Sequence, residues 1–197
     1  MSNQSENSEN TTILTSEYIN SLPILKFAGP IEMINTACEL GELVEKLRNE
    51  PCIGFDTESR PSFIKGTKYP ISLIQLATPS TVYIIRFAKT GLTGSLLEFM
   101  QSDVEKIGVG LVDDAKKLRS IRPFEPKGII DLSDIAKSKG LVKSGLRTLS
   151  ARYLNHRIVK TAQKTNWAKT SLTENQLRYA ATDAWACLLI RPLLEKT

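Results

Sequence analysis

The sequence predicts one α/β domain, in which a mixed sheet of five to six strands is flanked by helices. Short apolar runs bounded by turn residues alternate with amphipathic segments along most of the 197 residues. Two of these runs, ISLIQLAT and VYIIRF, are separated by only three residues, which indicates a hairpin. A hairpin-led sheet followed by strand and helix alternation is typical of a layered α/β fold.

The polar start of the chain differs from the rest. Residues 1–24 are rich in Ser, Asn, Thr and Glu, with few large apolar side chains. Such a segment buries too little apolar surface to offset the entropy lost on ordering. We therefore expect a flexible tail over residues 1–24 and a folded domain over residues 25–197.

The first elements of the domain follow this tail. Residues 25–34 predict an edge strand interrupted by Gly29-Pro30, and the capping-box pair Thr36 and Glu39 opens a helix that extends to about Arg48.

The apolar run CIGFD predicts a central strand, and the hairpin follows it. We therefore expect the first three strands of the sheet, from this run through the hairpin, to be antiparallel neighbours. Further strands are expected at KIGVGL and GIIDL. Helices are expected over residues 92–101, 113–121, 146–154 and 174–190, the last capped by Thr173.

The net charge of +5 is unevenly distributed. Residues 1–50 carry three basic and eight acidic side chains, whereas residues 51–197 carry 23 basic and 13 acidic ones. A basic domain is expected of a protein that binds a polyanion, although a solvated surface can be basic without a ligand.

The composition also bears on location. The three cysteines have no metal-ligand spacing and are expected to be reduced thiols. No apolar run approaches the roughly 20 residues of a membrane span, and the start lacks the pattern of a secretory signal. We expect a cytoplasmic protein without a membrane-spanning segment.

Acidic residues stand at three points of the predicted elements. Asp56 and Glu58 are two residues apart at a strand end, which places both side chains on one face, about 6.5 Å apart along the backbone. Asp114 lies where a strand meets a helix, and the adjacent Asp113 is better placed to cap that helix.

The third point is a helix that carries Tyr179 and Asp183 one turn apart on the same face. Small residues around this pair would let the helix approach the strand that carries Asp56. Taken alone, each of the three features has a commoner interpretation: a solvated turn, a helix cap and two exposed helical positions.

Converging acids repel one another, and their pKa values rise unless cations are bound between them. Oxygen ligands favour hard ions such as Mg²⁺ or Mn²⁺, and a pair of such ions can stabilise both the attacking and the leaving oxygen in phosphoryl displacement.

Three motifs occur together in one order: FDTE at residues 55–58, GVG at residues 108–110 followed by Asp114, and YAATDA at residues 179–184. In this combination the chain resembles the DEDDy 3'-5' exonucleases, a family that includes ribonuclease D and the exonuclease domain of Werner-syndrome helicase. The resemblance extends from about Lys26 to the C-terminus.

The resemblance implies a ribonuclease H-like sheet, two divalent cations and release of nucleoside 5'-monophosphates from the 3' ends of DNA or RNA. It implies that Asp56 bridges both ions and that Glu58 and Asp183 hold the ion that activates water. It further implies that Asp114 supports the second ion through water and that Tyr179 orients the attacking water.

The contacts to nucleic acid are predicted from charge. Residues 135–173 contain nine Lys or Arg and no acid. Within them, Lys143 and Arg147 are one helical turn apart, and Lys160 and Lys164 follow; all four are expected to contact phosphates. Phe63, in the loop after the first acidic pair, is expected to contact the terminal nucleotide.

Two alternatives remain open from the sequence. One is a nucleic-acid-binding module that keeps the fold and does not cleave, and the other is a ribonuclease H-like endonuclease. Metal-dependent shortening of a labelled oligonucleotide separates the exonuclease from the first, and cleavage of a circular substrate identifies the second.

Overall fold

The computed structural model describes residues 14–64, 66–67 and 69–196. Six strands form one sheet in the order β1-β4-β3-β2-β5-β6. They are β1 (Ile31–Ile34), β2 (Cys52–Ser59), β3 (Ile71–Ala77), β4 (Val82–Arg86), β5 (Glu105–Gly108) and β6 (Ile129–Asp131). Strands β2, β3 and β4 pair antiparallel, and the other three pairings are parallel. The predicted α/β class and the antiparallel first three strands are therefore confirmed.

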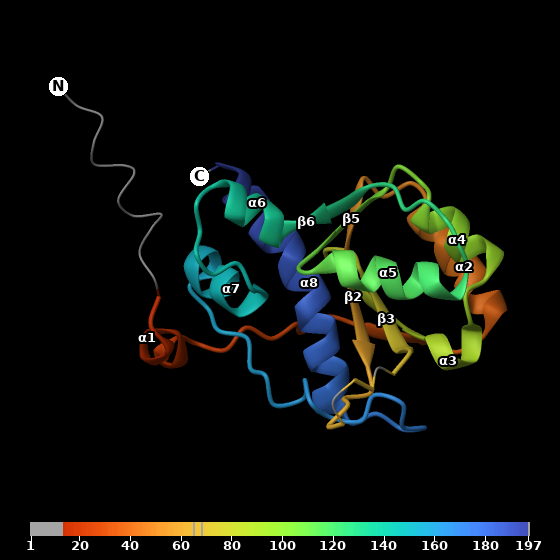
Figure 1. Ribbon diagram of the computed structural model, residues 1–197, viewed down its shortest axis with the longest axis horizontal. Coiled ribbons are helices and arrows are strands. Elements are labelled where there is room, and N and C mark those ends of the chain that lie inside the picture. Colours follow the sequence, from red (N-terminus) through yellow and green to blue (C-terminus); the bar gives the residue numbers. More distant parts are fainter. Residues whose placement is uncertain (1–13, 65, 68, 197) are drawn as a thin grey trace.

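Helices lie on both faces of the sheet (Figure 1). In the described residues they are α1 (Ser16–Ser21), α2 (Ala37–Leu47), α3 (Phe87–Thr90), α4 (Gly94–Met100), α5 (Leu111–Ile121), α6 (Leu132–Ser138), α7 (Leu146–Leu154) and α8 (Glu174–Lys196). The long helix α8 crosses one face, and α6 and α7 pack against it. Helices α2, α4 and α5 cover the other face. No helix in the described residues is long and apolar enough to span a membrane.

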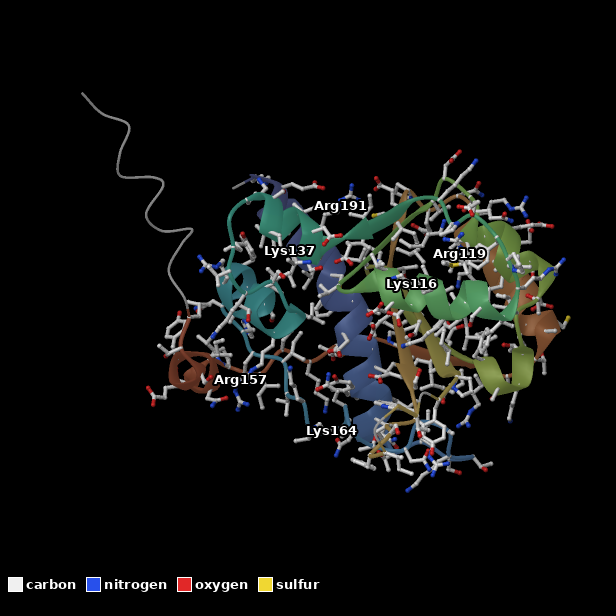
Figure 2. All side chains as sticks on the ribbon, in the orientation of Figure 1. Lys116, Arg119, Lys137, Arg157, Lys164 and Arg191 are labelled. Atoms are coloured by element: carbon white, nitrogen blue, oxygen red, sulfur yellow. The ribbon has the colours of Figure 1, made fainter. Side chains whose placement is uncertain are left out.

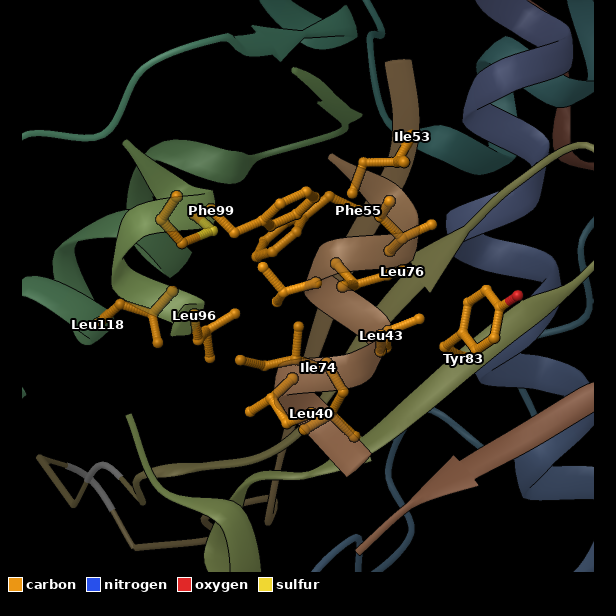
Figure 3. Close-up of a cluster of buried hydrophobic side chains, with 14 of the residues drawn as sticks. Leu40, Leu43, Ile53, Phe55, Ile74, Leu76, Tyr83, Leu96, Phe99 and Leu118 are labelled. Carbon is orange, nitrogen blue, oxygen red and sulfur yellow. The ribbon is translucent and has the colours of Figure 1, made fainter. Parts of the chain in front are cut away.

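The main apolar core lies between the sheet and the layer formed by α2 and α4 (Figure 3). Ile53 and Phe55 of β2 point into it, together with Ile74 and Leu76 of β3. Because side chains alternate along a strand, the residues between these four face α8 instead. Strand β2 therefore presents its acids to α8.

The capping box at the start of α2 is confirmed. The Thr36 hydroxyl accepts a hydrogen bond from the Glu39 N–H, and the Glu39 carboxylate accepts one from the Thr36 N–H. The preceding edge strand is also present, although β1 begins only at Ile31, after Gly29-Pro30.

Several element boundaries differ from the prediction, and two of them lie next to the acidic residues. Strand β2 continues to Ser59, because residues 57–59 pair with β3. Strand β5 ends at Gly108 and α5 begins at Leu111, two residues before the predicted helix. A side chain at Gly108 would meet the Phe55 carbonyl oxygen at 2.4 Å, so the chain passes close to β2 at this turn.

The prediction of a flexible tail is wrong for the part of it that the structure describes. Helix α1 is capped by the Thr15 hydroxyl, and Ile19 and Leu22 are buried against Ala151 of α7. Its apolar contacts offset the entropy of ordering, which composition alone did not reveal. Residues 1–13 lie outside the described part of the chain.

Candidate active site

Three carboxylates meet between β2 and α8. Asp56 and Glu58 leave the α8 side of β2, and Asp183 reaches them from α8; one oxygen of each lies within 4.8 Å of the others. Residues that are about 125 positions apart in the sequence thus form one oxygen cluster, as predicted for these three acids.

Small residues make this approach possible. A Cβ atom at Gly54 would lie 2.1 Å from the Ala184 carbonyl oxygen, so the backbones of β2 and α8 are in contact there. Ala180 and Ala181 are fully buried on the same face of the helix. The helix therefore lies close enough to the strand for the short side chain of Asp183 to reach Asp56.

The cluster raises the pKa values of its members. Burial raises the pKa of Glu58 to about 10, and the charges of Asp56 and Asp183 add to this effect. Burial raises the pKa of Asp183 to about 7, against the lowering effects of a hydrogen bond from Tyr179 and of the Lys160 charge. Burial and the neighbouring Asp183 and Asp114 also raise the pKa of Asp56. Without cations these acids are therefore difficult to ionise.

Tyr179 lies beside the cluster, one turn before Asp183 on α8. Burial and its bond to Asp183 raise the pKa of its hydroxyl, which stays protonated and able to donate. Its ring lies 6.0 Å, centroid to centroid, from the ring of Trp167, which is fully buried. Trp167 therefore packs against the Tyr179 ring and restricts its orientation. Because Trp167 is buried, it is not available for stacking with a base.

Asp114 lies next to the cluster but is not one of the three acids whose oxygens lie within 4.8 Å of one another. Its carboxylate accepts a hydrogen bond from the Thr57 hydroxyl at 2.7 Å and pairs with Lys117 at 3.2 Å. Its charge nevertheless contributes to the raised pKa values of Asp56 and Glu58. This placement fits the expectation that Asp114 supports a cation through a water molecule better than direct binding of the cation by Asp114.

The expectation that Asp113 caps α5 is wrong. Gly110 is the N-cap residue, with a positive φ of 79°. The Asp131 carboxylate accepts hydrogen bonds from the Gly110 and Leu111 N–H groups and supplies the missing cap from β6. Asp113 is exposed and pairs with Lys116 on the helix surface.

A cavity of about 490 Å³ opens over the three carboxylates. Lys143, Arg147 and Lys160 line it together with Tyr179. Lys143 precedes α7 rather than lying on it, so the predicted helical spacing with Arg147 is wrong although both reach the cavity. Basic and acidic groups thus line one cavity.

Two of the predicted nucleic-acid contacts are placed elsewhere. Phe63 is 84% exposed, and it is not among the described residues that line the cavity. Lys164 lies in the segment between α7 and α8 and is not among the described residues that line the cavity. Both remain predictions for a nucleic acid that extends beyond the cavity.

The cavity also has walls that the sequence did not reveal. Leu14, Ser16 and Ile19 line it from the N-terminal segment, and the Asn20 side chain accepts a hydrogen bond from Arg147. A signal existed, because Ile19 and Leu22 follow the N-cap Thr15 at helical spacing. Gln163 joins the lining from the loop before α8.

The cluster fits hard divalent cations. Its ligand atoms are all carboxylate oxygens, the type that Mg²⁺ and Mn²⁺ prefer. Within the described residues, the Oδ1 atom of Asp183 is buried and has no hydrogen-bond partner, although buried polar atoms are normally paired. A bound cation would satisfy this atom and remove the repulsion within the cluster.

Comparison with known proteins assigns the chain to a family. Residues 31–197 match the family described as 3'-5' exonuclease. The chain is 30% identical over 190 residues to the mouse bifunctional 3'-5' exonuclease/ATP-dependent helicase WRN, covering 87% of this chain and 13% of that protein. It is 43% identical over 168 residues to ribonuclease D of Haemophilus influenzae, covering 82% and 40%.

Solved structures agree with this assignment. The Escherichia coli RNase D structure superposes with a TM-score of 0.76 at 26% identity and covers 84% of this chain and 44% of that one. The chain thus spans less than half the length of these three relatives. The ribonuclease H-like sheet expected from the sequence is the one that the structure and its neighbours share.

Proposed function

The chain belongs to the 3'-5' exonuclease family, and from this we propose that it hydrolyses phosphodiester bonds at the 3' ends of nucleic acids. We propose nucleoside 5'-monophosphates as products and two divalent cations, Mg²⁺ or Mn²⁺, as cofactors. The observation that carries the proposal is the meeting of Asp56, Glu58 and Asp183 within 4.8 Å at the base of a cavity with basic walls.

The three clustered acids would hold the cations. When bound, the cations would activate water and stabilise the charge that develops on the phosphate oxygens. Asp56 is central to this arrangement, because, beyond the effect of burial, Asp183 and Asp114 both raise its pKa and its own charge raises the pKa of Glu58. Asp114, already held by Thr57 and Lys117, would act from the edge of the cluster.

Tyr179 would orient the attacking water. Its hydroxyl is protonated and lies beside Asp183. A phenol can donate one hydrogen bond and accept others, so it can fix a water molecule relative to the scissile phosphate. The packing of Trp167 on its ring limits the directions in which it can do so.

The substrate would enter with its phosphates toward Lys143, Arg147 and Lys160. These residues line the same cavity as the acids, so they can neutralise the phosphate charge that the carboxylates repel. Leu14 and Ile19 close part of the same cavity with apolar side chains. A chain end fits such a partly closed space more readily than the middle of a continuous strand.

The test is an assay on matched DNA and RNA oligonucleotides with a 5' label, in Mg²⁺ and in Mn²⁺, next to a circular substrate. We expect stepwise shortening from the 3' end, an intact circle and no shortening in EDTA. Asp183→Asn should reduce the rate to background while the protein stays folded.

Other results of this assay have definite meanings. Stable binding without shortening in both metals would favour a non-cleaving binding module. Cleavage of the circle would identify an endonuclease. Activity of Asp183→Asn at the wild-type rate would remove the proposed mechanism.

A further inference from the structure

A buried amide lies directly beside the acidic cluster. Gln75 is in the central strand β3 and is fully buried, at 0% exposure. Within the described residues, neither its side-chain nitrogen nor its oxygen has a hydrogen-bond partner. Burying an amide without partners costs free energy, so the position requires an explanation beyond core packing.

The register of the sheet places this amide next to Asp56. Gln75 and Asp56 are directly opposite each other in the antiparallel pair of β3 and β2. Directly opposite residues project from the same face with their Cβ atoms about 4.5–5.5 Å apart. The side chain of Gln75 therefore leaves the sheet on the side of α8, where Asp56 meets Asp183.

The buried neighbours of Gln75 on this face are apolar. Leu73 and Ala77 precede and follow Gln75 on the same side of β3, and Ile84 is its partner on β4. Ala180 and Ala184 of α8 belong to the same buried apolar cluster. Asp56, directly opposite Gln75 in the register, is therefore the acid that the sheet places next to the amide.

We propose that Gln75 is a positioning residue, whose side-chain N–H group donates a hydrogen bond to the Asp56 carboxylate when cations are bound. The inference rests on the proposed function. A carboxylate that binds a cation stays ionised and keeps lone pairs free to accept from a second group. Hydrogen bonds of this kind orient metal ligands, and their loss typically lowers metal affinity about 10- to 100-fold.

The chemistry explains why a glutamine suits the position. An apolar residue would fill the space and leave Asp56 free to rotate, whereas a second carboxylate would add repulsion to a cluster that is already acidic. A lysine would compete with the cations for the same oxygens. The neutral amide donates without contributing charge.

The test compares Gln75→Leu and Gln75→Met with the unaltered chain. Both variants carry an apolar side chain of similar size and lack the amide N–H donor of glutamine. Mn²⁺ binding is measured by titration calorimetry without nucleic acid, and melting is measured in EDTA. We expect the dissociation constant for Mn²⁺ to rise about 10- to 100-fold. We expect the melting temperature in EDTA to stay unchanged or rise, because an unpaired buried amide is removed.

Ile84→Val is the matched control. It alters the same face on the other side of Gln75, and we expect it to lower the melting temperature and leave the Mn²⁺ affinity unchanged. Wild-type Mn²⁺ affinity in both Gln75 variants would overturn the inference, and so would a fall in melting temperature with unchanged affinity. Failure of the unaltered chain to bind Mn²⁺ would instead overturn the proposed function itself.

Discussion

The carboxyl group of Asp183 combines the properties that a metal ligand needs at this place. It is 8% exposed, and its Oδ1 atom lacks a partner within the described residues. It accepts from Tyr179, which fixes its orientation. Its burial would be unfavourable in an ionised, metal-free protein, so the same features that raise its pKa also prepare it to bind a cation.

Replacing Tyr179 by Phe tests the role of the hydroxyl group. The ring should keep its packing on Trp167, because the aromatic contact does not involve the oxygen. We expect kcat to fall by less than about 100-fold, the lower end for a positioned acid–base group, with little change in substrate affinity. A fall to background, like that expected for Asp183→Asn, would show that the hydroxyl does more than orient water.

The raised pKa values predict how the stability of the metal-free protein depends on pH. Asp183 has a folded pKa of about 7 and Glu58 of about 10, above the ordinary values of 3.8 and 4.5 for these groups. The folded state then binds protons more tightly than the unfolded state, so its stability falls as pH rises from about 4 through these folded values.

Thermal melts in EDTA between pH 5 and pH 8 measure this effect. We expect the melting temperature to fall with rising pH, and to fall less steeply in Asp183→Asn between pH 5 and pH 7. Added Mn²⁺ should raise it most at pH 8, where fewer protons compete for the oxygens. Identical slopes for the variant and the unaltered chain would contradict a raised pKa at Asp183.

At the scale of the elements, the site depends on the contact between β2 and α8. Gly54 and the alanines of α8 let the two backbones touch, and the alternation of β2 turns Asp56 and Glu58 toward the helix. Strand and helix each carry part of the cluster. The distance between them therefore controls the separation of Asp183 from the other two acids.

Gly54→Ala should widen this separation. The added Cβ would meet the Ala184 carbonyl oxygen, so α8 must shift, and such overpacking typically costs about 1–3 kcal/mol. We expect lower thermal stability. We also expect Mn²⁺ affinity and activity to fall by more than the loss of stability alone would cause. The control is Gly41→Ala in α2, where nothing lies within 4 Å of the new atom. There we expect a gain of about 0.5–1 kcal/mol and unchanged activity. Equal effects on activity would contradict this account.

Local signals made several elements predictable. The capping box of Thr36 and Glu39 lies within one turn, and α7 has the predicted bounds because its apolar period and polar flanks are also local. Long-range contacts decided what was not predicted. Helix α5 starts early because Asp131, which comes later in the chain, caps it, and α1 is ordered by burial against α7.

The site shows the same division. The motifs indicated Asp56, Glu58 and Asp183, and the fold brings their oxygens together. The partners of Asp114 and the N-terminal wall of the cavity depend on packing between distant segments, which residue types alone do not reveal. Gln75 lies in a mostly apolar strand, so its position next to Asp56 follows only from the register of the sheet.

At the scale of the whole molecule, charge is segregated as a polyanion-binding protein requires. The balance of −5 over residues 1–50 and +10 over residues 51–197 separates an acidic N-terminal part from a basic remainder. Lys143, Arg147 and Lys160 bring part of the basic charge to the cavity. Other basic residues lie on α5 (Lys116 and Arg119), α6 (Lys137) and α8 (Arg191), as labelled in Figure 2.

This distribution predicts a salt dependence of binding. In the Asp183→Asn background, the affinity for a single-stranded oligonucleotide should fall steeply as salt rises, because phosphate contacts release counterions. Removing Lys160 by substitution to Ala should weaken binding and lower the slope of log affinity against log salt by about 1. Lys89→Ala, at an exposed position of α3, should change neither. Fluorescence anisotropy measures both quantities, and equal slopes for all three proteins would exclude a phosphate contact at Lys160.

Asp56, Glu58 and Asp183 are proposed to bind the catalytic divalent cations. Anomalous diffraction from crystals of the protein soaked in Mn²⁺ locates bound ions without relying on activity. We expect anomalous density within coordination distance of all three carboxylates, and its loss in Asp183→Asn. Density bound elsewhere, or none at these oxygens under saturating Mn²⁺, would contradict it.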